Sequence, residues 1–128
     1  MKSILFLCPH GAAKSVMASA YCQHLAQQKG LNVTTQCAGT DPDAEVAPAV
    51  AALLQTEGVA ITNQPPHAVT TEELAAADYI ISLGCDVSHL IPPQTEIIDW
   101  SDVPLPSQGL QRSRDMIYEK VQRFVDEL

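Results

Sequence analysis

The chain has 128 residues, 46% of them hydrophobic, and carries a formal net charge of −8. A chain of this length buries roughly two-thirds of its unfolded surface, so we expect one domain over residues 1–128 that folds without disulfides or a structural metal. Because only 7 Lys and Arg oppose 15 Asp and Glu, the composition argues against a nucleic-acid partner. An anionic substrate would have to be captured by local groups, since the acidic surface repels it at long range.

The N-terminal apolar run, Ser3–Leu7, is too short to cross a membrane and lacks the features of a signal peptide. We therefore expect a cytoplasmic protein without a membrane partner, in which the cysteines are reduced. The four cysteines are Cys8, Cys22, Cys37 and Cys85. Their spacing fits no zinc site, and no metal or organic cofactor is implied.

Hydrophobic periodicity predicts strands and helices in alternation. In chain order, the predicted elements are a strand at Ser3–Leu7, a helix at Ser15–Lys29, a strand at Leu31–Cys37, a helix at Glu45–Glu57, a short helix from the cap Thr70 to Ala77, a strand at Asp78–Leu83, a helical turn at Val87–Leu90, a strand at Thr95–Trp100 and a helix at Leu110–Glu127. Proline-rich loops are predicted at 60–69 and 101–109, and at Pro92-Pro93. Such alternation implies a parallel sheet covered by helices on both faces, with ligands binding beyond the carboxyl ends of the strands.

The first strand runs directly into the first helix through a short loop. This loop is Cys8, Pro9, His10, Gly11, Ala12, Ala13, Lys14 and Ser15. A strand-to-helix loop directs backbone amides and the positive helix end at one point, which favours a tetrahedral oxyanion. The same dipoles favour a thiolate at Cys8, the nucleophilic form of cysteine, to which Ser15 can donate a hydrogen bond. The alternative is that Cys8 is a buried packing residue at a strand end.

Four stretches carry a family resemblance that spans nearly the whole chain. ILFLCPHGAAKSVMASAY resembles the start of the low-molecular-weight tyrosine phosphatases and thioredoxin-type arsenate reductases, whose loop is C-x5-R-S. Cys37-Ala38-Gly39-Thr40 is similar to the family's S-A-G-T, and VAPAVAALLQTEGVAI and DYIISL are similar to its second helix and third core strand. The resemblance implies a three-layer α/β/α domain with a four-stranded parallel sheet in the order 2-1-3-4, the flavodoxin-like fold of these phosphatases.

The resemblance also implies a chemistry. In this family the cysteine, here Cys8, attacks phosphorus or arsenic, while the loop amides and the cation at position 14 hold the oxygens. The implied partners are phosphate, arsenate or a phosphorylated substrate, together with a thiol reductant such as thioredoxin for arsenate. In the phosphatases an aspartate of a D-P loop acts as general acid, for which Asp102 is the candidate here.

Three departures from the family pattern predict weakened activity. Lys14 stands in place of arginine and cannot grip two oxygens with a planar fork. In the segment DVPLP, Leu105 occupies the expected position of the acid, and leucine transfers no proton, so Asp102 serves only if the loop shifts. The alternative for Asp102 and Asp99 is a turn-forming role. Gly11 permits a positive φ in the loop, but it replaces the asparagine that often orders the family's loop, which predicts a looser loop.

Cys85, in SLGCDVSHL, lies within one residue of the position of a redox cysteine in the arsenate reductases, although the next cysteine of their relay is missing. It is a candidate second thiol or, equally, a packing residue. Cys22 and Cys37 are predicted to pack in the interior. His10 could donate to the oxyanion or, as an imidazolium, favour the Cys8 thiolate, but we expect its side chain to face solvent. His24 and His67 are interpreted as surface residues without a partner. Three functions therefore stay open: a Cys8-dependent phosphatase or arsenate reductase, a catalytically impaired oxyanion-binding or regulatory module, and a Cys8/Cys85 redox protein.

Overall fold

The structure, a computed structural model, describes residues 2–61, 66–91 and 95–128. Its elements are β1 (Lys2–Cys8), α1 (Lys14–Gln28), β2 (Val33–Gly39), α2 (Pro48–Thr56), α3 (Thr71–Ala76), β3 (Tyr79–Ser82), the 3-10 turn η1 (Ser88–Leu90), β4 (Ile98–Asp99), the 3-10 turn η2 (Pro106–Gln108) and α4 (Leu110–Asp126). The predicted break at Pro92-Pro93 and residues 62–65 of the predicted loop at 60–69 lie outside the described residues. None of the described helices has the length and hydropathy needed to cross a bilayer.

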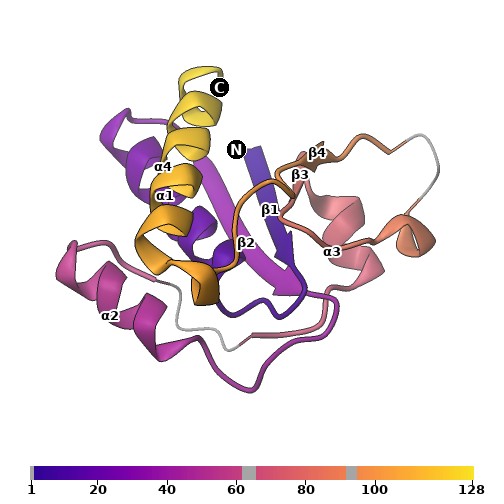
Figure 1. Ribbon diagram of the computed structural model, residues 1–128. Coiled ribbons are helices and arrows are strands. Elements are labelled where there is room, and N and C mark those ends of the chain that lie inside the picture. The colour runs from indigo at the N-terminus through magenta and orange to yellow at the C-terminus, as the bar shows by residue number, and fades with distance from the viewer. Residues whose placement is uncertain (1, 62–65, 92–94) are drawn as a thin grey trace.

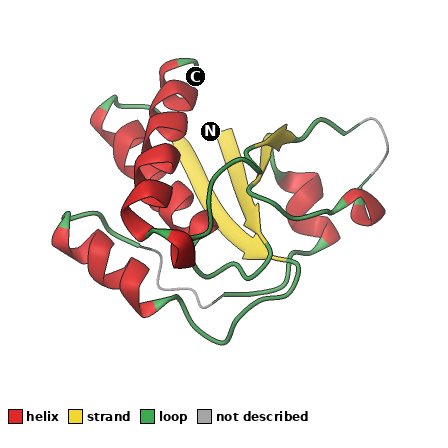
Figure 2. Cartoon of the chain, viewed as in Figure 1, coloured by secondary structure: helices red, strands yellow, loops and turns green. Residues whose placement is uncertain are grey.

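The four strands form one parallel sheet in the order β2-β1-β3-β4. α1 and α4 lie against one face of this sheet, and α3 lies on the opposite face (Figures 1 and 2). β1 and β2 run side by side and end together, so that the loop after Cys8 and the loop after Gly39 leave the same edge (Figure 1). The predicted three-layer fold and strand order are confirmed.

The side chains of β1 alternate between two apolar clusters. Ile4, Phe6 and Cys8 belong to the larger cluster, which includes residues of α1, α2 and α4. Leu5 and Leu7 belong to a smaller cluster with residues of α3 and β3. Because both faces of β1 are buried, its sequence is an almost continuous apolar run, as expected for the central strand of a parallel sheet. This packing fixes the position at which the chain leaves β1 and enters the Cys8 loop.

Several predicted boundaries differ from the structure. The second helix begins at Pro48 and not at Glu45, because proline has no amide proton and its fixed φ suits the first helical position. The second strand lies two residues later than predicted, at Val33–Gly39. The fourth strand pairs with β3 only at Ile98 and Asp99. The predicted loop at 101–109 contains the short turn η2.

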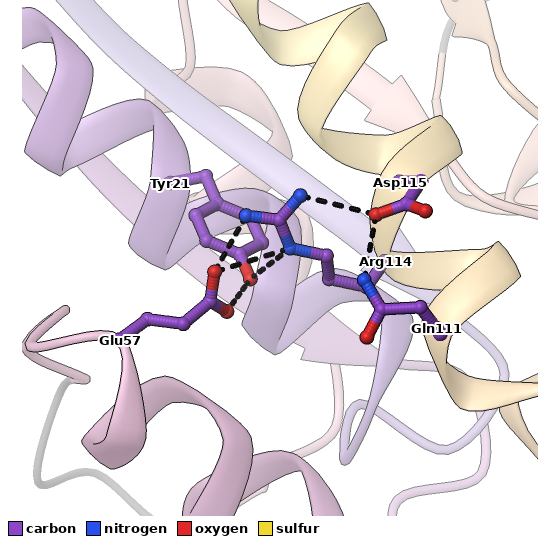
Figure 3. A network of polar contacts seen from close by, with 5 residues as sticks. All are labelled: Tyr21, Glu57, Gln111, Arg114 and Asp115. Carbon is purple, nitrogen blue, oxygen red and sulfur yellow. Dashed lines mark hydrogen bonds and ion pairs between the residues drawn. The ribbon is translucent and has the colours of Figure 1, made fainter.

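A polar network joins three helices at the edge of the larger cluster (Figure 3). Arg114 of α4 lies over the ring of Tyr21 in α1, with 5.3 Å between the guanidinium carbon and the ring centroid, and pairs with Glu57 at 2.5 Å. The Tyr21 hydroxyl donates to Glu57 across 2.5 Å. Although burial acts to raise the pKa of Glu57, the hydrogen bonds from Arg114 and Tyr21 outweigh it and lower the pKa. The network fastens the end of α2 to α1 and α4.

We expect Arg114→Met to reduce the free energy of unfolding by about 1–3 kcal/mol, because Glu57 and the Tyr21 hydroxyl lose a charged partner in a partly buried site. A carboxylate with a lowered pKa stabilises the fold above its unfolded pKa, near 4.3, and loses that contribution as the pH falls through the folded pKa. Urea unfolding should therefore show a deficit that is largest at neutral pH and shrinks below about pH 4. Arg123→Met removes an exposed pair with Glu119 and should change stability by less than about 0.5 kcal/mol at either pH.

Candidate active site

The loop between β1 and α1 is held by its carbonyl groups. Three of these carbonyls accept backbone hydrogen bonds from the segment that follows β2: Pro9 from Asp41 at 2.7 Å, His10 from Asp43 at 3.0 Å and Ala12 from Ala47 at 2.9 Å. Within the described part of the chain, the backbone amides from His10 to Ser15 donate to no carbonyl or side chain. Occupied carbonyls and unoccupied amides make the loop a cradle of hydrogen-bond donors at a helix N-terminus, an arrangement that suits an anion.

Two glycines let this cradle lie directly against the sheet. Gly11 has a φ of 60°, a left-handed conformation that glycine adopts without steric cost. Gly39, the last residue of β2, lies so close to the loop that a β-carbon there would be 2.7 Å from the Gly11 nitrogen and 2.8 Å from the Pro9 oxygen. The backbone of Gly39 is bonded on its other side to the His67 carbonyl and the Val69 amide. Gly11 was predicted to permit this turn, whereas the contribution of Gly39 was not foreseen.

Cys8 ends β1 at the base of the cradle. Its side chain is 3% exposed, and its Sγ lies 3.1 Å from the hydroxyl oxygen of the fully buried Ser15. The thiol donates in this contact when protonated. The hydroxyl donates when the sulfur is a thiolate, which stabilises the charged form. The structure thus brings together the sulfur and the predicted donor.

Lys14, the first residue of α1, is 7% exposed. Among the described residues it enters no hydrogen bond or ion pair. Its Nζ lies 3.4 Å from the position that a β-carbon on Gly84 would occupy, so the ammonium reaches the loop after β3. Burying a cation without an anionic partner is costly. An anion in the cradle would supply the missing partner.

Cys85 follows Gly84 and is partly buried. Its amide donates to the Ser82 hydroxyl at 3.3 Å, and that hydroxyl donates to the Cys85 carbonyl at 2.8 Å. The pKa of the Cys85 thiol is raised, chiefly by burial; Cys8 also acts to raise it, while the Ser82 contact and Lys14 act to lower it. Cys8 and Lys14 therefore both lie within electrostatic range of Cys85. All four cysteines are free thiols in this structure.

The other two cysteines fit the packing roles predicted for them. Cys22 is fully buried, and burial raises its pKa to about 12. Cys37 is partly buried, and its pKa is raised to about 11, chiefly by burial and to a lesser extent by Cys8 and Glu73. Thiols with such pKa values are almost entirely protonated at neutral pH and are poor nucleophiles.

Asp102, the predicted general acid, lies on the loop after β4. Its side chain is 60% exposed and pairs with Lys120 of α4 at 3.1 Å. Leu105, at the position expected for the acid, is 50% exposed. Asp99 instead lines a cavity of about 480 Å³ together with Ser82 and Cys85. A carboxylate beside the candidate second thiol was not expected, because Asp99 was interpreted as a turn-forming residue.

The histidines differ in their surroundings. The side chain of His10 is 61% exposed, as predicted, and pairs with Asp43 at 3.3 Å. The interpretation of His67 as a surface residue without a partner is wrong, since its Nε2 lies 2.8 Å from Glu73 and its side chain is only 35% exposed. The pairing depends on a contact between a loop and α3 that local sequence does not reveal. Within the described residues, no three His, Cys, Asp or Glu side chains gather as a metal site would require.

The site thus combines a buried cysteine, a buried cation and a loop of free backbone amides at a helix N-terminus, on a parallel α/β sheet. Residues 3–125 match the sequence model of the low molecular weight phosphotyrosine protein phosphatases. The chain belongs to this family, which comprises cysteine-dependent phosphatases and arsenate reductases.

Several individual proteins to which the chain is similar are arsenate reductases. The chain is 26% identical over 123 residues to a putative arsenate reductase of Halobacterium salinarum, covering 94% of this chain and 87% of that one. It is 27% identical to an arsenate reductase of Bacillus subtilis, covering 98% and 96%. The solved structure of a thioredoxin-dependent arsenate reductase of Corynebacterium glutamicum superposes with a TM-score of 0.86 and 28% identity, covering 99% of this chain and 61% of the longer protein.

Proposed function

We propose that Cys8 is a nucleophile that attacks a tetrahedral oxyanion held by the amides of residues 10–15 and by the ammonium of Lys14. The observation that carries this proposal is that Lys14 is buried without a partner among the described residues, beside a cradle whose carbonyls are bonded and whose amides are not. An oxyanion satisfies the cation and the amides together.

With a phosphate monoester, the Cys8 thiolate forms an S–P bond as the P–O bond to the leaving group breaks, and the leaving oxygen takes the electron pair. Water then hydrolyses the thiophosphate, which releases phosphate and restores the thiolate. Asp102 is paired with Lys120, and Leu105 transfers no proton. The site therefore favours aryl esters, because a phenol with a pKa near 10 leaves without protonation more readily than an alkyl alcohol.

Arsenate reduction is the second candidate function, and the electrostatic proximity of Cys85 to Cys8 and Lys14 favours it. In this reaction Cys8 attacks arsenic and displaces water. The thiolate of Cys85 then attacks Cys8 Sγ, an S–S bond forms, and the S–As electron pair passes to arsenic, which leaves as arsenite. A dithiol reductant such as thioredoxin would reduce the disulfide and close the cycle.

Cys85→Ser separates the two functions. If Cys85 acts only in the redox route, the variant should lose thiol-dependent arsenate turnover by at least ~10²-fold and keep the hydrolysis of para-nitrophenyl phosphate within about two-fold, because only disulfide formation needs a second sulfur. Cys22→Ser is the matched control and should leave both rates unchanged per folded molecule. Arsenate turnover that survives in Cys85→Ser would remove Cys85 from the reaction.

A further inference from the structure

The loops around the Cys8 cradle carry acidic side chains, whereas the cradle itself carries a buried cation. On one side of the cradle, the loop after β2 supplies Asp41 and Asp43, whose backbone amides are bonded to the cradle carbonyls. On the other side, Asp86 and Asp99 line the cavity that also contains Cys85. The cradle therefore contains a buried cation, while the surrounding rim of the site carries carboxylates.

The cavity and the Lys14 ammonium meet at Gly84. Gly84 lines the cavity, and the space left by its missing side chain lies 3.4 Å from Lys14 Nζ. A group attached to an oxyanion in the cradle can therefore extend past Gly84 toward the two aspartates. Lys14 is only 7% exposed and has no partner among the described residues. A buried ammonium without a partner indicates that an anion binds at this junction.

The carboxylates of Asp86 and Asp99 are ionised and can pair with a cationic group of a ligand. The Oδ1 of Asp86 accepts from the Ser88 amide at 2.9 Å, and the Oδ1 of Asp99 accepts from the Ser101 amide at 2.9 Å. These hydrogen bonds hold the pKa of both carboxyl groups below the usual range, so both are ionised at neutral pH. In the described part of the chain, neither carboxylate forms an ion pair.

We infer that the preferred substrate is a phosphorylated peptide segment with lysine or arginine beside the phosphoryl-bearing residue, and that Asp86 and Asp99 bind those cations. The inference rests on the proposed function, since the phosphoryl group occupies the Cys8 cradle. A rim of carboxylates repels a free dianion such as phosphate or arsenate. A cationic flank converts that repulsion into attraction while leaving the contacts of the phosphoryl group unchanged.

The test measures fluorescence anisotropy of three phosphotyrosine peptides on Cys8→Ser, a variant that binds without turnover. The peptides differ only in their flanking residues, which are lysine, serine or glutamate. We expect the lysine peptide to bind about five- to ten-fold more tightly than the serine peptide at low salt, and the glutamate peptide to bind more weakly than either. The differences should shrink at 0.5 M NaCl, because salt screens exposed charges.

The double variant Asp86→Asn and Asp99→Asn, made in the Cys8→Ser background, should abolish the preference for lysine. Asparagine keeps the carbonyl oxygen that accepts the turn hydrogen bonds, so the loops stay folded. Asp126→Asn removes one charge at the far end of α4 and should leave the preference intact. Equal affinity for the three peptides, or an equal loss of preference in Asp126→Asn, would overturn the inference alone. If no peptide binds and the native chain hydrolyses neither the peptides nor para-nitrophenyl phosphate, the phosphatase function falls as well.

Discussion

Cys8→Ser is expected to lower the hydrolysis of para-nitrophenyl phosphate and the reduction of arsenate by at least ~10³-fold, because a serine hydroxyl is not ionised at neutral pH and both reactions begin with a thiolate. The exchange replaces one atom, so the 3.1 Å contact with Ser15 and the packing of β1 should persist. Initial rates at saturating substrate, divided by the concentration of folded protein, measure the effect.

Cys8→Ser should still bind anions, because the loop amides and Lys14 are unchanged. Measuring anion binding in this variant therefore distinguishes the role of the Cys8 thiolate from the role of the cradle. At 100 times the Kd, phosphate stabilises the folded state by about 2.7 kcal/mol, which a thermal melt detects as a rise of several degrees in Tm. We expect this rise in the native chain and in Cys8→Ser, and expect Lys14→Met to reduce it. Full activity in Cys8→Ser would contradict the proposed nucleophile, and an unchanged rise in Lys14→Met would contradict the role of the ammonium.

Gly39→Ala is expected to lower phosphatase activity by ~10²-fold and stability by about 1–3 kcal/mol, although Gly39 has no side chain that could act on a substrate. A β-carbon at this position would lie 2.7 Å from the Gly11 nitrogen and 2.9 Å from the His10 carbonyl carbon. These are backbone atoms, which cannot rotate away as the end of a side chain does. The cradle would have to move, and its amides would no longer converge on one point.

Gly58→Ala provides the control. Gly58 has a φ of 71°, and a β-carbon there would meet no atom within 4 Å. This variant should lose about 1–2 kcal/mol of stability from left-handed strain but retain activity per folded molecule and the stabilisation by phosphate. If Gly39→Ala behaves as Gly58→Ala does, the close packing of Gly39 against the loop is unimportant for catalysis.

The sequence was informative wherever local patterns decide structure. The apolar run before Cys8, the helical spacing after Ser15 and the glycine in the loop predicted β1, α1 and the turn between them. Their alternation with later elements predicted the sheet, and the resemblance supplied its order. The predicted start of α2 was less accurate, because Pro48 sets the first helical position. The predicted bounds of β4 were also less accurate, because the length of that strand depends on pairing with β3 and not on the local pattern.

Contacts between distant residues were beyond prediction. Arg114 meets Glu57 across 57 positions and Tyr21 across 93, and no periodicity connects them. The fit of Gly39 against the loop depends on the parallel register that pairs it with Cys8. The placement of Asp99 in the cavity depends on the pairing of β4 with β3, and the pairing of Asp102 with Lys120 depends on the path of the loop after β4. The candidate acids are therefore the part of the site that sequence alone described least well.

The use of carbonyls to anchor the loop and of amides to face the ligand has an evolutionary consequence. Chemistry encoded in the path of the main chain survives side-chain replacement at positions 9, 10, 12 and 13, provided that the path is kept. Acidic or basic residues can then accumulate on the surrounding loops under separate selection. A protein built in this way can change its substrates through small changes in surface residues while its reaction stays the same.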